Sequence, residues 1–207
     1  MNTALEYIVK KFNLDLTKTQ PIQIGSIGRI GLAEAFAELG LNTGAEIGVD
    51  RGAFSEILCK ANPKLQLFSI DPWSTAPFEN PIYSAKSMQG QYERHRQDAE
   101  HRLSNYNCRI IRKESLEAVK GFADNSLDFV YIDANHNFIN IASDIYRWEK
   151  KVKIGGFVSG HDYHHFPPAR DNHVKHIVDA YVQAFEINPY FELGQDRYHS
   201  WFWVKEK

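Results

Sequence analysis

Apolar and polar residues alternate along the chain in blocks that predict strands and helices in turn. The first apolar run of strand length covers residues 45–49, and a glycine turn and a predicted helix over residues 54–61 follow it. The later strands are four similar runs over residues 65–71, 109–112, 127–133 and 157–160, with helices expected over 116–121, 139–152 and 174–185. Such alternation favours parallel strands with right-handed crossovers and helices on both faces.

The C-terminal end of the chain predicts a different pairing. Two strand-like runs, residues 190–193 and 200–204, are separated by a short polar stretch. A connection this short joins antiparallel neighbours. The predicted fold is therefore a Rossmann-like, doubly wound α/β sheet of seven strands, mostly parallel, with one antiparallel strand near the C-terminus and helices on both faces.

Residues 1–43 precede this pattern and read as a helical extension. Apolar residues recur at helical spacing over residues 3–13, and a second helix is expected over residues 30–39, with residues 14–27 as a connector. The extension either packs on the edge of the sheet or roofs a substrate pocket. Residues 44–207 form the main domain.

Residues 72–107 interrupt the alternation. Pro72, Pro77 and Pro81 predict a loop, and a strongly polar helix is expected over residues 84–103. A long polar insertion beside a binding site is often a lid. The alternative is a solvated surface helix.

Composition narrows the class of protein. The 207 residues suit one domain with a well-buried core, and a formal net charge of −2 disfavours broad binding to nucleic acid or to anionic membranes. The N-terminal residues carry scattered charges without the apolar segment of a signal peptide, and no stretch has the length and apolarity of a membrane span. We expect a cytoplasmic protein whose partner is a small molecule.

Polar side chains recur directly after the predicted parallel strands. Ligands of open α/β sheets bind outside the carboxyl ends of the strands, so this recurrence predicts one site along that edge. The residues concerned are Asp50, Asp71, Glu114, Ser115, Asp133, His161 and Asp162.

The glycine turn indicates what kind of cofactor the site holds. Its spacing is Gly48-x-x-x-Gly52, which differs from the G-x-G-x-x-G of dinucleotide sites, and no phosphate-binding G-x-x-x-x-G-K-[ST] occurs in the chain. Asp50, inside the turn, would repel a pyrophosphate. The turn therefore disfavours NAD and favours a cationic or zwitterionic ligand.

Together, Glu46-x-Gly48-x-x-x-Gly52 and Asp71 resemble motifs I and II of class I S-adenosylmethionine-dependent methyltransferases. The C-terminal strand pair also resembles the ending of that fold. The resemblance implies that the cofactor residues are Glu46, Gly48, Asp50, Gly52, Asp71, Trp73, Glu114, Ser115 and Asp133. Within this set, Asp71 would accept hydrogen bonds from the ribose hydroxyls, and Trp73 or the Glu114–Ser115 pair would lie near the adenine.

The second half of the chain resembles the small-molecule O-methyltransferases of catechol and macrocin types. This likeness implies a divalent cation, Mg²⁺ or Mn²⁺, held by Asp133, His161 and Asp162. The chain departs from the family pattern at His161, where the family has an acid, and histidine is a softer ligand. If no metal is used, His136 or His161 is the candidate catalytic base.

The predicted function is methyl transfer from S-adenosylmethionine to an oxygen of a small molecule, with or without a metal. Two alternatives stay open: an NAD(P)-dependent oxidoreductase and a non-catalytic protein of the same fold. Residues 201–203, Trp-Phe-Trp, are expected in the core of the sheet or at the surface of a homodimer.

Overall fold

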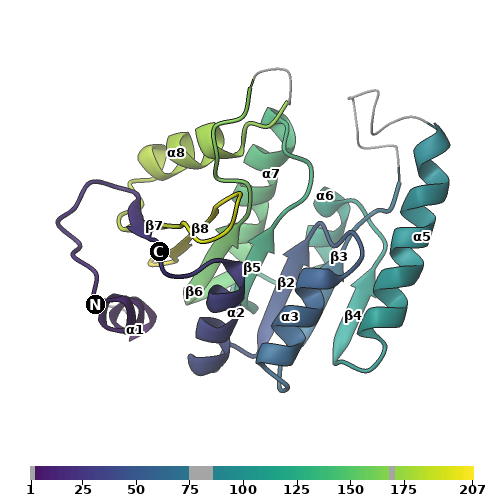
Figure 1. Cartoon of the computed structure of the whole chain (residues 1–207), viewed down its shortest axis with the longest axis horizontal. Helices are drawn as coiled ribbons and strands as arrows, with labels where there is room; N and C mark the ends of the chain where they lie inside the picture. Colours follow the sequence, from purple (N-terminus) through teal and green to yellow (C-terminus); the bar gives the residue numbers. More distant parts are fainter. Residues whose placement is uncertain (1–2, 75–85, 168–170) are drawn as a thin grey trace.

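The protein is built on one mixed sheet of eight strands (Figure 1). A computed structural model describes residues 3–74, 86–167 and 171–207. The strands lie in the order β1-β7-β8-β6-β5-β2-β3-β4. The predicted fold class is confirmed, with one strand more than expected.

Five consecutive parallel strands form the part of the sheet that positions the site. They are β2 (Thr43–Ile47), β3 (Gln66–Ile70), β4 (Cys108–Ile111), β5 (Leu127–Ile132) and β6 (Val152–Gly160). The register is even at the tips, because Ile47 of β2 pairs with both Ile70 and Ile132. The residues that follow these strands therefore meet at one edge of the sheet.

The C-terminal strands form the predicted antiparallel pair. Strand β8 (Ser200–Val204) lies between β6 and β7 (Tyr190–Leu193) and runs antiparallel to both. Trp201, Phe202 and Trp203 are fully buried within the chain. Their side chains alternate between the buried clusters on the two faces of the sheet and do not form an exposed surface.

The eighth strand corrects the prediction for residues 14–27. Strand β1 (Ile22–Ile24) pairs in parallel with β7, with Ile22 and Ile24 buried. Three residues between Pro21 and Gly25 carry too little pattern to distinguish a strand from a connector. The pairing depends on contacts with residues almost 170 positions away, which no local signal encodes.

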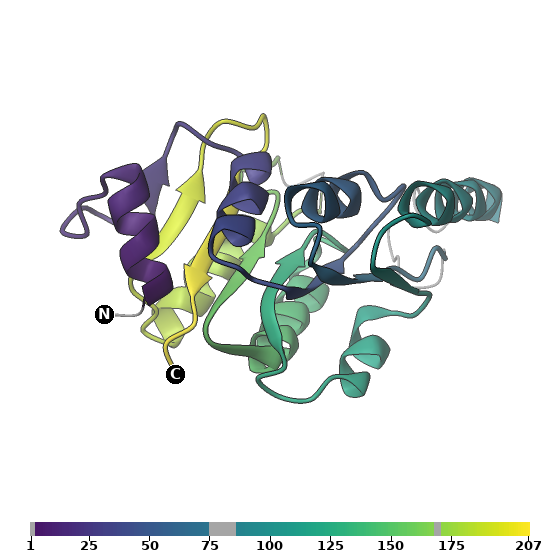
Figure 2. The ribbon, with the colours of Figure 1, turned by 90° about the horizontal axis from the view of Figure 1, so that it is seen from below.

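Helices cover both faces of the sheet (Figure 2). One face carries α1 (Thr3–Phe12), α2 (Arg29–Glu38), α3 (Ala53–Ala61) and α5 (Lys86–Leu103). The opposite face carries α6 (Ser115–Ala118), continued by a 3₁₀ turn over Val119–Gly121, then α7 (Phe138–Trp148), continued by a 3₁₀ turn over Glu149–Lys151, and α8 (Val174–Ala184). Among the described helices, none combines the length and apolarity needed to cross a membrane.

The N-terminal segment shares the core of the main domain. Leu5 and Ile8 of α1 pack in the same buried cluster as Phe36 of α2 and Phe202 of β8. The segment therefore covers one face of the sheet near its β1 edge. Polar helix α5 also has a buried side, since Ala99 and Leu103 are shielded from solvent. Part of the predicted lid over residues 72–107, namely residues 75–85, lies outside the described residues.

The boundary between α7 and β6 differs from the prediction. The helix was expected to run to residue 152 and the strand to begin at 157, but α7 ends at Trp148 and β6 begins at Val152. The strand passes through Gly155-Gly156, a pair that usually marks a break. A Cβ at Gly156 would lie 2.4 Å from the backbone oxygen of Asp128, so glycine allows the two strands to approach closely there.

Candidate active site

A cavity of about 510 Å³ opens along the carboxyl ends of β2 to β6. Its walls are strand tips, the start of α6, the side of α7 that carries Asn140 and Asp144, and the loops before α8 and β8. No Lys or Arg is among the described residues that line it, and its acidic lining residues are Asp50, Asp71, Glu114, Asp133, Asp144, Asp162 and Asp171. Such a lining favours a cationic ligand over a phosphate.

Gly48 brings the glycine turn against the tip of β5. Its φ of 89° lies in the left-handed region, and a Cβ at this position would lie 2.1 Å from the backbone oxygen of Asp133. Both features require glycine. Gly52, with a φ of 75°, precedes the first residue of α3 and packs against Ala99 of α5, but it does not line the cavity.

Asp71, at the tip of β3, fastens the glycine turn. One carboxylate oxygen accepts hydrogen bonds from the backbone N–H of Val49 (2.9 Å) and Asp50 (3.0 Å), and the other accepts one from Trp73 N–H (2.7 Å). Burial raises the pKa of Asp71, and these three backbone donors oppose that rise. The carboxylate also lines the cavity, as the prediction for a ribose ligand requires.

Trp73 and His95 hold the glycine turn from outside through contacts with Asp50. The Trp73 ring is 1% exposed, packs with Val49 and Ala99, and donates its Nε1–H to the backbone oxygen of Asp50 (2.8 Å). The Asp50 carboxylate is hydrogen-bonded to Nδ1 of His95 on α5. Sequence reasoning missed His95, because it lies 45 residues away in a helix whose composition is mostly polar. A contact between Trp73 and adenine stays a prediction.

Glu46 lies away from the cavity. Its side chain points under α3, where Ser55 Oγ donates to it, and Ser55 Oγ lies 2.8 Å from Ser69 Oγ. Burial raises the pKa of Glu46 well above its usual value. In this arrangement Glu46 contributes to a buried polar chain beneath α3, and a direct contact with cofactor stays a prediction.

Ser115, after β4, is the predicted residue whose surroundings are most informative. Its Oγ accepts a hydrogen bond from Trp148 Nε1 (2.8 Å) and donates one to Asp144 Oδ1 (2.5 Å). Asp144 is 3% exposed, and burial raises its pKa to about 7. Glu114, Ser115 and Asp144 all line the cavity. Asp144 was not predicted, because mid-helix acids usually face solvent.

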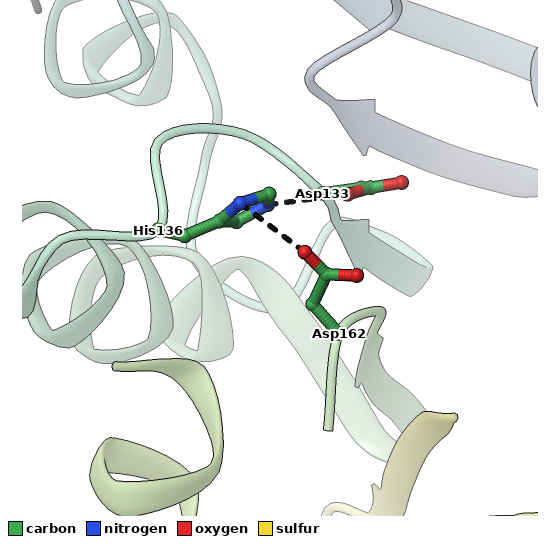
Figure 3. Close-up of side chains that lie close together, drawn as sticks. All are labelled: Asp133, His136 and Asp162. Atoms are coloured by element: carbon green, nitrogen blue, oxygen red, sulfur yellow. Dashed lines mark hydrogen bonds and ion pairs between the residues drawn. The ribbon is translucent and has the colours of Figure 1, made fainter. Parts of the chain in front are cut away.

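The second group of functional residues lies after β5 and β6 (Figure 3). His136 is placed between two carboxylates, with Nε2 3.3 Å from Asp133 Oδ1 and Nδ1 3.2 Å from Asp162 Oδ2. Asn172 Nδ2 donates to the same oxygen of Asp162 (2.9 Å). One ligand atom from each of Asp133, His136 and Asp162 falls within 4.8 Å of the others.

His161 lies behind these carboxylates. Its Nδ1 is 3.2 Å from Asp162 Oδ1 and 3.7 Å from Asp133 Oδ2, but His161 does not line the cavity. The predicted trio of Asp133, His161 and Asp162 is thus brought together, with His136 on the cavity side. Arg29, at the start of α2, also reaches Asp133 Oδ2 (3.9 Å) and was missed by sequence reasoning.

The charges of this cluster support one another. Burial alone would raise the pKa of Asp133, but the hydrogen bond to His136 and the nearby cationic groups outweigh it and lower that pKa. Burial alone would lower the pKa of His136, yet Asp133 and Asp162 raise it. The protein alone therefore favours an imidazolium between two carboxylates, a form that donates a proton and does not accept one.

The donor set also fits a divalent cation. Two carboxylates and one imidazole converge from the loops after β5 and β6, and a cation could replace the proton that His136 carries. Mixed oxygen and nitrogen donors suit Mn²⁺, Fe²⁺ or Zn²⁺ better than Mg²⁺.

The fold and the cavity define a class of protein. The sheet is parallel except for β8, which is inserted between β6 and β7. A glycine turn follows β2 and an acid follows β3. These are the features from which the sequence predicted a class I methyltransferase. A family model described as "Methyltransferase domain" matches residues 45–163, more than half of the chain. The chain therefore belongs to this methyltransferase family, and the predicted class, an S-adenosylmethionine-dependent methyltransferase, is confirmed.

Solved structures resemble most of the chain at low identity. A provisionally named caffeoyl-CoA O-methyltransferase from Staphylococcus aureus matches with a TM-score of 0.64 and 14% identity over 97% of this chain and 90% of its own. An O-methyltransferase from Bacillus cereus, solved with SAH, has a TM-score of 0.61 and 14% identity over 99% and 92%. Spermidine synthase from Thermotoga maritima has a TM-score of 0.57 and 13% identity over 84% and 57%. No curated protein matched the sequence. Likeness at this identity shows the fold and leaves the acceptor open.

Proposed function

We propose that the chain transfers the methyl group of S-adenosylmethionine to an oxygen of a small molecule. The observation that carries the proposal is the position of the Asp133–His136–Asp162 cluster, which lines the same cavity as Asp71 and the glycine turn. A donor site and a proton-handling site thus face one shared space. The O-methyltransferases among the solved structures of similar fold support the choice of oxygen.

The order of the strands suggests how the cofactor lies. Ribose hydroxyls at Asp71, after β3, place the base toward Ser115, after β4, on one side. On the other side, the methionine part lies by Gly48, after β2, and the sulfonium faces Asp133, after β5. The acidic lining stabilises the positively charged sulfonium of the bound cofactor. The charge on the sulfur falls to zero as the methyl group leaves.

The chemistry at the acceptor end is a single displacement. The acceptor oxygen forms a bond to the methyl carbon, the carbon–sulfur bond breaks, and the hydroxyl proton passes to a group of the cluster. Asp133 and Asp162 would orient the hydroxyl and accept its proton, and Asn172 and His161 would hold the Asp162 carboxylate in place. Such positioning accounts for much of the acceleration in a bimolecular transfer.

Asp133, His136 and Asp162 would hold a divalent cation if the reaction uses one. When bound, the cation would lower the pKa of the acceptor hydroxyl. His136 would then be a ligand, with its imidazole neutral. Without a cation it is an imidazolium paired with the two carboxylates, so the protonation state of His136 separates the two forms of the mechanism.

Calorimetric titration with S-adenosylhomocysteine tests the proposal. We expect micromolar binding by the wild type, binding weakened by about 100-fold or more in Asp71→Asn, and retained binding in Asp133→Asn with turnover lost on a panel of hydroxylated acceptors. Adding a chelator, and then Mn²⁺ or Mg²⁺, decides the role of metal. Failure of the wild type to bind at millimolar ligand would overturn the proposed function.

A further inference from the structure

We propose that Asp144 is the residue that recognises the adenine of the cofactor, by accepting a hydrogen bond from its 6-amino group. The inference rests on the proposed function, because it concerns the base end of the same cavity. It assigns a role to a buried acid on the side of α7, outside the strand-tip loops that supply the other expected cofactor residues.

The hydrogen bonds around Ser115 determine which atom of Asp144 is free. Trp148 Nε1–H can only donate, so Ser115 Oγ accepts that bond and uses its own hydrogen toward Asp144 Oδ1. The second oxygen, Oδ2, receives no hydrogen bond from the part of the chain that the structure describes, and it is not among the fully buried atoms without a partner, so it is open to the cavity. A carboxyl group that is 3% exposed and lines a cavity needs a donor, and a ligand in that cavity is positioned to supply it.

The position of Asp144 matches the base and no other part of the cofactor. Asp144 contacts Ser115 after β4, whereas Asp71 follows β3 and Asp133 follows β5 on the far side of β2. Asn140, one turn earlier on α7, lines the cavity as well, so this helix presents one polar face to it. Ile70 and Leu116 contribute apolar surface to the cavity. An adenine ring carries an amino donor on an otherwise flat, weakly polar body.

The test compares two ligands that differ at one group. These are S-adenosylhomocysteine and the analogue in which a carbonyl oxygen replaces the 6-amino group, titrated near pH 8.5, where the carboxylate form prevails. We expect the wild type to prefer the amino ligand by about 10- to 100-fold. Asp144→Ala should weaken binding of the amino ligand by a similar factor and remove the preference.

Asp144→Asn provides a second variant of nearly the same shape, in case Asp144→Ala fails to fold. Ser115 still donates to the amide oxygen, so the amide nitrogen faces the cavity and the preference should reverse toward the carbonyl ligand. Glu114→Gln tests the competing acid, since Glu114 lines the same cavity and is the other acid expected near the adenine. Asp171→Asn is the matched control, since Asp171 lines the same cavity but pairs with His173. It should keep the wild-type preference.

The outcomes separate this inference from the function on which it rests. Binding of the amino ligand by the wild type, with the same preference retained in both Asp144 variants, overturns the role of Asp144 and leaves the methyltransferase intact. Loss of the preference in Glu114→Gln alone assigns the base to Glu114 and also overturns it. If the wild type binds neither ligand, the proposed function and this inference both fail.

Discussion

Asp71 is expected to do two things with one carboxylate: to hold the glycine turn and to bind the cofactor. Its oxygens already accept three backbone N–H groups of the glycine turn and the following loop. The same carboxylate is expected to accept the ribose hydroxyls. A substitution there should therefore affect both the ligand and the turn.

Asp71→Asn should weaken binding of S-adenosylhomocysteine by about 100-fold or more, since charge-assisted hydrogen bonds contribute about 1.5–3 kcal/mol each. It should also lower the free energy of unfolding in the absence of ligand, because an amide nitrogen facing a backbone N–H cannot accept its hydrogen. Calorimetry measures the first effect and urea denaturation the second. A variant with weakened binding and unchanged stability would show that the turn does not depend on this carboxylate.

Asp144 should make stability depend on pH. Burial raises its pKa to about 7 in the folded protein, against 3.8 for the free side chain, so the folded state holds the proton more tightly. The resulting stabilisation is complete below about pH 4 and is lost as pH rises through 7. Asp144→Asn removes this dependence. The difference in free energy of unfolding between Asp144→Asn and the wild type should therefore shift by about 2–3 kcal/mol in favour of the variant from pH 5 to pH 8.

Urea denaturation at the two pH values measures this difference, and Asp98→Asn, which removes an exposed carboxylate, is the control. Equal pH profiles for the wild type and Asp144→Asn would contradict a buried, proton-holding Asp144.

At the scale of elements, the site depends on how closely neighbouring strand tips approach. The turn after β2 touches the tip of β5 at Gly48, and β6 follows β5 closely at Gly156. These contacts place the glycine turn and the Asp133 cluster on one cavity. Glycine is required at both positions because backbone atoms of β5 and its following loop occupy the space that a Cβ atom would need.

Gly48→Ala should destabilise the protein by about 3 kcal/mol or more, since it combines a positive φ with a clash against the backbone of Asp133. Gly40→Ala is the matched control. Gly40 also has a positive φ, 69°, but nothing lies within 4 Å of its Cβ position, so the cost should be near 1 kcal/mol. Thermal unfolding of both variants measures the difference. Equal losses would show that the contact with β5 is unimportant.

At the scale of the whole molecule, the N-terminal segment and the main domain share one core. Ile8 of α1 is fully buried in a cluster that includes Phe157 and Phe202 of the sheet. Strand β1 extends the same sheet by pairing with β7. Ile8→Ala should therefore cost about 2–4 kcal/mol. The variant should still unfold in a single transition, which circular dichroism and tryptophan fluorescence would report together. Two separated transitions would show that residues 1–43 form an independent unit.

The sequence by itself determined the features that are local in the chain. The alternation of apolar runs, the glycine spacing and the acids after successive strands sufficed for the fold class, the antiparallel C-terminal pair and most of the acidic lining. These signals are readable because strand and helix periods act over a few residues and because parallel strands end at a common edge.

Only the tertiary structure decided which side chains meet. Contacts between elements distant in sequence bring His136 to the cavity in place of His161 and Asp144 beneath Ser115, turn Glu46 inward and join β1 to the sheet. These results depend on side-chain direction and on packing across the sheet, which short-range patterns do not encode.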